Sequence, residues 1–192
     1  MRFIALGVIA ATLAANVLAA DEPIDKGYRG LFVRNGPVFA CVIDKNQDVK
    51  PQDLKGFTDQ WCLHMGKFAI GSDVKLLGSL GKPVQVTEES PGLENSIFVL
   101  GADAKTPYVV VTASKTRIHA LQVTGDKPLQ DWTFNGIMLG DSKAALSKIF
   151  GSPSKITPLD DGELWSYLPW TFSFVITNGK VTSIRIATEE LA

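Results

Sequence analysis

Few residues of this chain could perform chemistry, and they do not form a recognisable catalytic or metal-binding set. The two histidines, His64 and His119, have no partner residues at the spacings that metal sites use. The sequence contains no Gly-x-Ser-x-Gly nucleophile motif and no phosphate-binding loop motif. Asp160, Asp161 and Glu163 form a carboxylate cluster, but their sequence is typical of an exposed hairpin turn. We therefore expect no enzyme activity, no metal and no cofactor.

Aromatic side chains are the best candidates for a functional surface. Two successive predicted strands carry alternating rows: Glu163, Trp165 and Tyr167 on the first, and Trp170, Phe172, Phe174 and Ile176 on the second. Alternation places each row on one face of its strand. The all-apolar second row is expected to face the core, which lets Trp165 and Tyr167 reach the outer face as anchors for a protein partner. The alternative is that both rings are buried. The predicted protein-binding residues are Trp165, Tyr167, Trp170, Tyr108 and His119.

The first 20 residues are typical of a secretory signal peptide. Arg2 precedes an apolar run over 3–17, and the small residues that follow fit cleavage after Ala19 or Ala20. An uncleaved membrane anchor is the alternative, since the run approaches the length that spans a bilayer. No cysteine follows the run to accept a lipid, and no later segment is apolar enough to span. We therefore expect a periplasmic or secreted protein with no stable membrane span after cleavage.

The charge of the chain bears on its possible partners, and its cysteines bear on a disulfide bond. The formal net charge is −1 and there is no basic stripe, so nucleic acid is not an expected partner. Cys41 and Cys62 are the two cysteines, and in an oxidising compartment we expect them to form a disulfide. Two separately buried thiols are the alternative. Redox catalysis is not expected, because there is no Cys-x-x-Cys spacing.

The helices and strands that must position these residues are predicted to form the same structural unit twice along the chain. Residues 70–83 (IGSDVKLLGSLGKP) resemble residues 139–153 (LGDSKAALSKIFGSP), and each stretch combines a Ser or Asp cap, a short amphipathic helix and a closing Gly-x-Pro. Strand-like runs separated by turn residues follow each stretch. Such self-similarity indicates tandem repeats, although helix-Gly-x-Pro-strand also arises by coincidence. The predicted units are a signal peptide (1–20), an N-terminal leader and hairpin (21–50), a first repeat (51–126) and a second repeat (127–192).

Two further elements are predicted before the first short helix. Asn35-Gly36 between the apolar runs 31–33 and 38–43 favours a β-hairpin. Pro51 begins a predicted amphipathic helix that ends near Met65, so a disulfide would join this helix to the hairpin.

Residues 135–187 resemble the SmpA/OmlA (BamE-like) module. The residues that carry the resemblance are Gly140-Asp141-Ser142, Gly151-Ser152-Pro153, Trp165-Ser166-Tyr167, Phe172-Ser173-Phe174 and Gly179-Lys180-Val181 with Ile184. In tandem, the module is similar to the architecture of β-lactamase-inhibitory proteins. The resemblance implies an α+β fold of two tandem helix-loop-helix plus antiparallel-sheet repeats, preceded by the N-terminal β-hairpin. It also implies binding to proteins, because family members of known function bind other proteins.

The predicted function is an exported, non-enzymatic protein-binding module of the cell envelope. Its partner would be another envelope or secreted protein, held on a sheet surface and at the seam between the repeats. The alternative is a periplasmic small-molecule carrier or sensor with a pocket between the repeats. A third hypothesis is an envelope hydrolase of an unrecognised kind.

Overall fold

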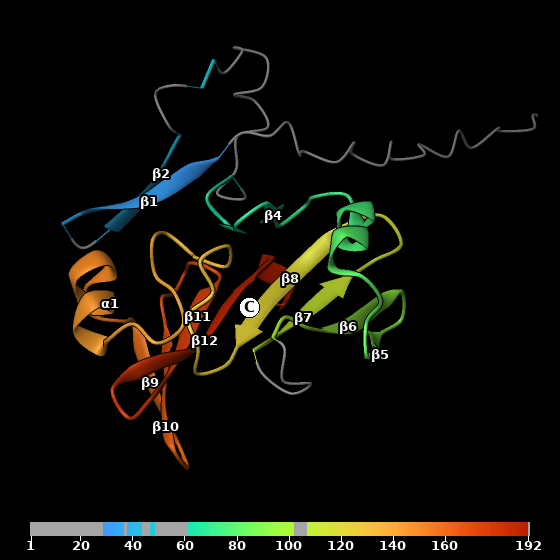
Figure 1. Cartoon of the computed structure of the whole chain (residues 1–192). Coiled ribbons are helices and arrows are strands. Elements are labelled where there is room, and N and C mark those ends of the chain that lie inside the picture. The colour runs from blue at the N-terminus through green and yellow to red at the C-terminus, as the bar shows by residue number, and fades with distance from the viewer. Residues whose placement is uncertain (1–28, 37, 44–46, 49–60, 102–106, 192) are drawn as a thin grey trace, which may run out of the picture.

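One antiparallel sheet of eight strands forms the centre of the protein (Figure 1). The computed structural model describes residues 29–36, 38–43, 47–48, 61–101 and 107–191. From one edge to the other, the strands are β5 (Gln85–Ser90), β6 (Leu93–Val99), β7 (Tyr108–Ala113), β8 (Ile118–Thr124), β12 (Lys180–Ala187), β11 (Phe172–Thr177), β10 (Gly162–Ser166) and β9 (Lys155–Leu159). Chain order therefore runs inward from both edges, and β8 and β12 meet in the middle.

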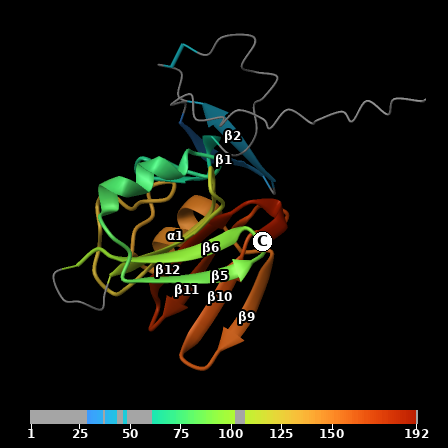
Figure 2. The same ribbon diagram turned by 90° about the vertical axis from the view of Figure 1, so that its right-hand side faces the viewer.

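A second layer covers one face of this sheet. It contains the hairpin of β1 (Gly30–Asn35) and β2 (Val38–Ile43), the short pair β3 (His64–Met65) and β4 (Phe68–Ala69), the 3-10 segment η3 (Val74–Leu80) and the helix α1 (Lys143–Phe150). Figure 2 shows the hairpin, η3 and α1 on the same side of the sheet. A last 3-10 turn, η4 (Glu189–Leu191), ends the described chain.

Aromatic rings fill the space between the layers near α1. Phe134 stacks on Phe150 with ring centroids 5.7 Å apart, and lies 5.0 Å from Phe172 of the sheet. Local sequence explains why α1 presents Phe150 there. The Ser142 hydroxyl accepts a hydrogen bond from the amide of Ala145 at the helix start, and Gly151 ends the helix at φ 72°.

The predicted α+β fold of two tandem helix-loop-helix plus antiparallel-sheet repeats is wrong. Strands dominate the described residues, which hold one continuous eight-stranded sheet, two small two-stranded sheets, the α-helix α1 and the 3-10 segments η3 and η4. The cause is the β8–β12 pairing, which places Ile184 opposite Val123 and so joins the two predicted sheets into one. The helix predicted to end near Met65 also fails there, because Met65 pairs with Phe68 in β3–β4. The start of that helix lies outside the described residues.

Two other predictions are confirmed. The N-terminal hairpin is confirmed, with Asn35 opposite Val38. The disulfide is confirmed, with the Cα atoms of Cys41 and Cys62 5.7 Å apart. No helix within the described ranges is long and apolar enough to cross a membrane. The predicted signal peptide lies outside those ranges.

Replacing both cysteines with alanine (C41A/C62A) should lower the free energy of unfolding by roughly 3 kcal/mol, because a loop of about 20 residues would no longer be closed in the unfolded chain. Urea denaturation followed by tryptophan fluorescence measures the change. Reducing the wild-type protein should give a similar loss, and the double variant should not respond to reductant. Equal urea midpoints for the two proteins would contradict the expectation.

Candidate functional site

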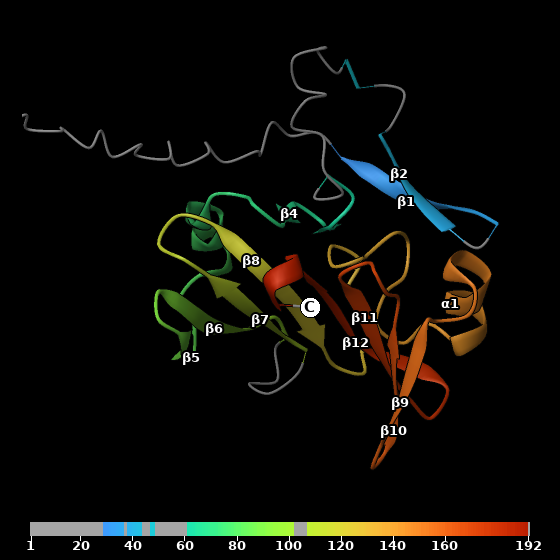
Figure 3. The same cartoon turned by 180° about the vertical axis from the view of Figure 1, so that it is seen from behind.

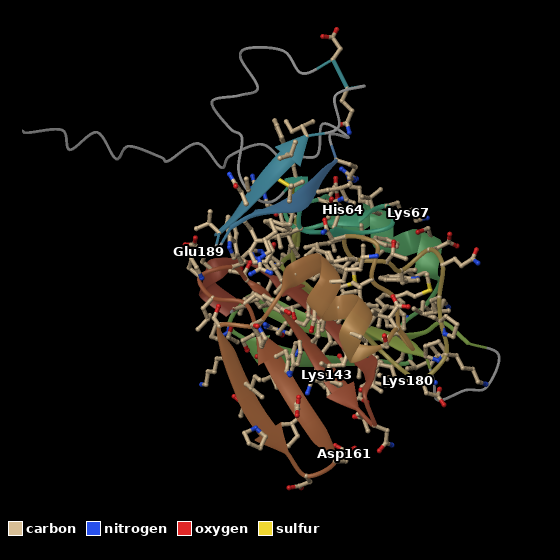
Figure 4. The ribbon with its side chains drawn as sticks, turned by 90° about the vertical axis from the view of Figure 1, so that its left-hand side faces the viewer. His64, Lys67, Lys143, Asp161, Lys180 and Glu189 are labelled. Carbon is tan, nitrogen blue, oxygen red and sulfur yellow. A yellow bond between two sulfur atoms is a disulfide. The ribbon has the colours of Figure 1, made fainter. Side chains whose placement is uncertain are left out.

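The β1–β2 hairpin is fixed to the rest of the protein by three anchors. The first is the disulfide from Cys41 to Cys62. The second is the carboxamide of Asn135, which accepts from the amide of Phe32 at 2.8 Å and donates to its carbonyl at 2.9 Å, as a neighbouring strand would. The third is His64, whose Nε2 donates to the carbonyl of Gly30 at 3.0 Å. Figure 4 shows His64 just beneath the hairpin.

The two faces of the hairpin have different surroundings. Its inner face contributes Phe32, which packs 5.3 Å from Phe172, and Phe39, which packs 5.8 Å from Phe150. Its outer face, the apolar hairpin face, consists of Leu31, Val33, Val38, Ala40 and Val42. All five are exposed, and the four larger side chains have 49% to 59% of their surface accessible. A hairpin that is apolar on both faces leaves one of them open to a partner.

A cleft of about 510 Å³ lies beside the apolar hairpin face. This hairpin cleft is lined by Arg34, Val38 and Phe39 of the hairpin, by Phe150, Ser152 and Ser154 at the end of α1 and beyond, and by residues 167–170. Its walls are mostly aromatic and aliphatic, with one cation among the lining residues.

Three polar side chains of the hairpin cleft are held in structural hydrogen bonds. Tyr167 donates its hydroxyl to the carbonyl of Gly151 at 3.1 Å, and burial raises the pKa of Tyr167 far above its ordinary value of 10.0. Ser154 donates its hydroxyl to the carbonyl of Leu168 at 2.8 Å. Arg34 donates its Nε proton to the carbonyl of Gly36 at 2.9 Å. This arrangement suits the binding of an apolar side chain better than the activation of a nucleophile.

The structure buries the two aromatic residues that were predicted to be interface anchors. Trp165 is 4% exposed and Tyr167 is 1% exposed, so their predicted outer-face position is wrong and the buried alternative is correct. The reason is strand register, because Trp165 lies opposite Phe174 and both rows therefore occupy the face that α1 covers. Alanine at either position would open a cavity in the core and would not probe a surface.

The other predicted binding residues are separated from one another. Trp170 is half-buried and forms part of the hairpin cleft. Tyr108 on β7 and His119 on β8 are partly exposed and do not line that cleft. Their role in binding stays a prediction.

The carboxylate cluster does not form an acid–base pair. Asp160 and Asp161 are exposed at the turn between β9 and β10, where Figure 4 labels Asp161. Glu163 accepts hydrogen bonds from Lys143 at 2.7 Å and from Trp165 at 2.8 Å. These two bonds lower the pKa of Glu163, and a carboxyl group that stays ionised is a poor general acid. Among the described residues, no group of three potential metal ligands occurs.

The predicted small-molecule pocket between the repeats is also wrong. The seam is the β8–β12 strand pair, and on its covered face Val123, Leu121, Ile184 and Ile186 are fully buried. Core side chains therefore occupy the place where that pocket was expected.

The apolar hairpin face was missed by the sequence reading, although a signal for it exists. The run Val38-Phe39-Ala40-Cys41-Val42-Ile43 has no polar residue, so both of its faces are apolar in any strand. A strand with two apolar faces is usually covered on both sides. Here the described residues cover one side, and the other is the candidate site.

Comparisons with known proteins leave the family open. No family model and no curated protein matches the chain. One similar structure is a cysteine-rich secretory protein from Staphylococcus aureus, with 19% identity over 66% of this chain and 48% of that chain, at a TM-score of 0.44. Another is an extracellular protein containing an SCP domain from Bacillus anthracis, with 15% identity over 78% of this chain and 51% of that chain, at a TM-score of 0.45. The chain spans about half the length of both structures.

Likenesses of this strength carry no argument about function, but two conclusions stand. The SmpA/OmlA and β-lactamase-inhibitory-protein-like resemblance is wrong, because no family model supports it and the fold lacks the helix-loop-helix units that it implies within the described residues. The protein is exported, either secreted or periplasmic. The Cys41–Cys62 disulfide supports this location, because such bonds persist in oxidising compartments.

Stability should fall below neutral pH because of His64, one of the hairpin anchors. Burial, reinforced by the charge of Arg29, lowers the pKa of His64 below its ordinary 6.5. The unfolded chain therefore binds a proton at a pH where the folded chain does not. The contribution of His64 to stability is full above pH 6.5 and is lost as the pH falls toward its lowered pKa.

Urea titrations between pH 7.5 and about 5 test this expectation. The decline in unfolding free energy should be shallower in His64→Gln than in the wild-type protein, and unchanged in the control His119→Gln. A decline of the same slope in wild type and His64→Gln would contradict it.

Proposed function

We propose that this protein is an exported, non-enzymatic protein-binding module of the cell envelope, and that it holds its partner on the apolar hairpin face and in the hairpin cleft. The observation that carries the proposal is the exposure of five apolar side chains on one face of a hairpin that is anchored to the core. Exposed apolar patches of this kind are typical of protein interaction sites.

The apolar hairpin face can supply binding free energy. Complete burial of an exposed Val or Leu side chain contributes about 1.5–3 kcal/mol. Leu31 and Val38 have 54% and 59% of their surface accessible, so a partner that covers them would gain a substantial part of that energy. The gain is specific to this face, because Phe32 and Phe39 on the opposite face already pack against core rings.

The hairpin cleft adds a place for a protruding side chain. Phe150 and Trp170 contribute aromatic surface, and Arg34 brings a guanidinium to the same cleft. No ion pair joins Arg34 to a carboxylate within the described residues. Aromatic and Arg side chains are enriched among residues that dominate binding energies, and Arg pairs well with carboxylates. We therefore expect the partner to present an apolar side chain close to an acidic residue.

The anchors make the surface ready for binding before the partner arrives. The disulfide at Cys41, the Asn135 carboxamide and the His64 ring each hold a different part of the hairpin. A surface that is already ordered loses less conformational entropy on association, so more of the contact energy appears as affinity.

The proposal is tested by placing charges on the apolar hairpin face. V33K/V42K should weaken capture of the partner about tenfold or more, because each lysine would have to be desolvated in the complex. Val86→Lys is the matched control, since Val86 is also an exposed valine on a strand, at 50% exposure on β5. Far-UV circular dichroism of both variants should match the wild-type spectrum.

The measurement has two stages. Cross-linking of the tagged protein in envelope extract, followed by mass spectrometry, identifies the partner, and calorimetry with the purified partner then gives the Kd. If V33K/V42K and Val86→Lys bind the partner as tightly as the wild-type protein does, the hairpin is not the binding site.

A small ligand in the hairpin cleft is a second candidate, favoured by the cleft volume of about 510 Å³, which is within the usual size of small-molecule sites. V33K/V42K would leave such a ligand bound, whereas Trp170→Ala would release it. The two candidates are therefore separated by which of these variants loses binding.

A further inference from the structure

We propose that two copies of this chain pair through the free edge of β2, antiparallel, with Ala40 on the two-fold axis. This inference concerns self-association and is independent of which partner the apolar hairpin face binds.

Within the described residues, the β1 edge of the hairpin is occupied at Gly30 and Phe32, and the β2 edge is free. Asn35 and Val38 face each other at the end of the hairpin, and their backbone groups point toward each other. Because this direction alternates along a strand, the backbone groups of the pairs Arg34–Phe39 and Phe32–Cys41 point away from the opposite strand. On β1 this is confirmed by Phe32, which bonds outward to Asn135. On β2 the same alternation directs the amides and carbonyls of Phe39 and Cys41 outward.

These outward groups of β2 have no hydrogen-bond partner within the described part of the chain. Figures 1 and 3 show the hairpin at the periphery of the molecule, beyond the eight-stranded sheet. A strand with unpaired backbone groups at the periphery is a ready template for another strand.

The edge strands of the eight-stranded sheet carry features that discourage pairing, and β2 does not. At one edge of the large sheet, β5 has Glu88, Glu89 and a register irregularity. At the other edge, β9 has Lys155 and Pro158. Charges, prolines and bulges of this kind protect edges from association. The sequence of β2, VFACVI, contains none of them.

The side-chain order of β2 favours a second copy as the occupant. The outward-facing residues Val38, Ala40 and Val42 read the same from either end. In an antiparallel pair centred on Ala40, Ala40 faces Ala40 of the partner subunit, and Val38 faces Val42 of the partner subunit. In the same register the outward amide of Phe39 meets the carbonyl of Cys41 of the partner subunit, and the reciprocal bonds form by symmetry.

A hetero-partner strand is a weaker fit to this edge. Because β2 carries no charge, it offers nothing that would select an acidic or a basic strand over a neutral one. The outward-facing residues of this edge have a two-fold pattern, and an antiparallel second β2 matches it at Val38, Ala40 and Val42.

Pairing would unite two apolar hairpin faces into the outer face of one four-stranded sheet. The contact is short, and interfaces below about 1,000 Å² are usually weak or transient. We therefore expect a concentration-dependent monomer–dimer equilibrium. A partner with two contact sites would bind the dimer more tightly than the monomer through avidity.

Engineered cysteines test both the pairing and its register. Residues that face each other at a position without ladder hydrogen bonds have Cα atoms about 4.5 Å apart, within the range that a disulfide spans. Ala40→Cys should therefore give a covalent dimer under mild oxidation, seen by non-reducing electrophoresis. Val38→Cys or Val42→Cys alone should not, whereas a mixture of the two should cross-link. Mass spectrometry checks that Cys41 remains bonded to Cys62.

Sedimentation velocity supplies a measurement without cysteines. The wild-type protein should shift toward the dimer as its concentration rises, and Ala40→Lys should stay monomeric because two ammonium groups would meet on the axis. A wild-type protein that remains monomeric and an Ala40→Cys protein that does not cross-link would together overturn the proposal. Equal cross-linking of all three single cysteine variants, or cross-linking of Ala40→Cys to a different protein, would also overturn it. Because Val42 faces Val38 of the partner subunit in this pairing, binding by V33K/V42K is measured at protein concentrations at which the wild-type protein is monomeric. A loss of binding there reports on the apolar hairpin face alone, so the proposed function can stand when this inference fails.

Discussion

The pairing of β8 with β12 is the interaction on which the rest of the structure depends. These strands come from distant parts of the chain, yet Val123 lies opposite Ile184 and Leu121 opposite Ile186 across the seam. The contact turns two sets of four strands into one sheet, and all four of these side chains are fully buried. Without it, β8 and β12 would each be an unprotected apolar edge. With it, β5 and β9 are the two edges of the large sheet among the described strands.

The hairpin depends on that sheet for its position. Phe32 and Phe39 reach rings that the sheet and α1 provide, so its inner face is fixed by the core beneath it. Its position over the core is then held by a covalent bond and by a few polar contacts. This division explains how an element can be well placed and still keep five apolar side chains exposed.

Local features of the fold could be predicted from the sequence, because their causes lie within a few residues. Asn178-Gly179 forms the turn between β11 and β12, with φ angles of 52° and 74°. Ser142 caps α1 and Gly151 ends it, as their types indicate. The hairpin and its disulfide followed from Asn35-Gly36 and from the two cysteines. These same capping and turn residues recur in many folds, which is why they also produced a false family resemblance.

Features that depend on strand register and on long-range strand pairing could not be predicted from the sequence. Alternation shows that Trp165 and Tyr167 share a face, but only the register of β10 against β11 decides that Phe174 lies opposite Trp165 on the covered side. No residue pattern within β8 or β12 indicates that these two strands pair with each other. The candidate site was missed for a related reason, because the apolar run of β2 does not reveal which of its faces the core will cover.

Asn135 has a consequence that extends beyond a single molecule. Its side-chain amide hydrogen-bonds to the outward amide and carbonyl of Phe32, so the β1 edge is blocked at this position, whereas the β2 edge is free within the described residues. Strands with two open edges can add further chains without limit and grow into fibres, whereas a strand pair with one open edge is complete after a single addition. If the hairpin pairs through β2, the Asn135 carboxamide, held by a backbone at φ 52°, would therefore limit the assembly to two copies.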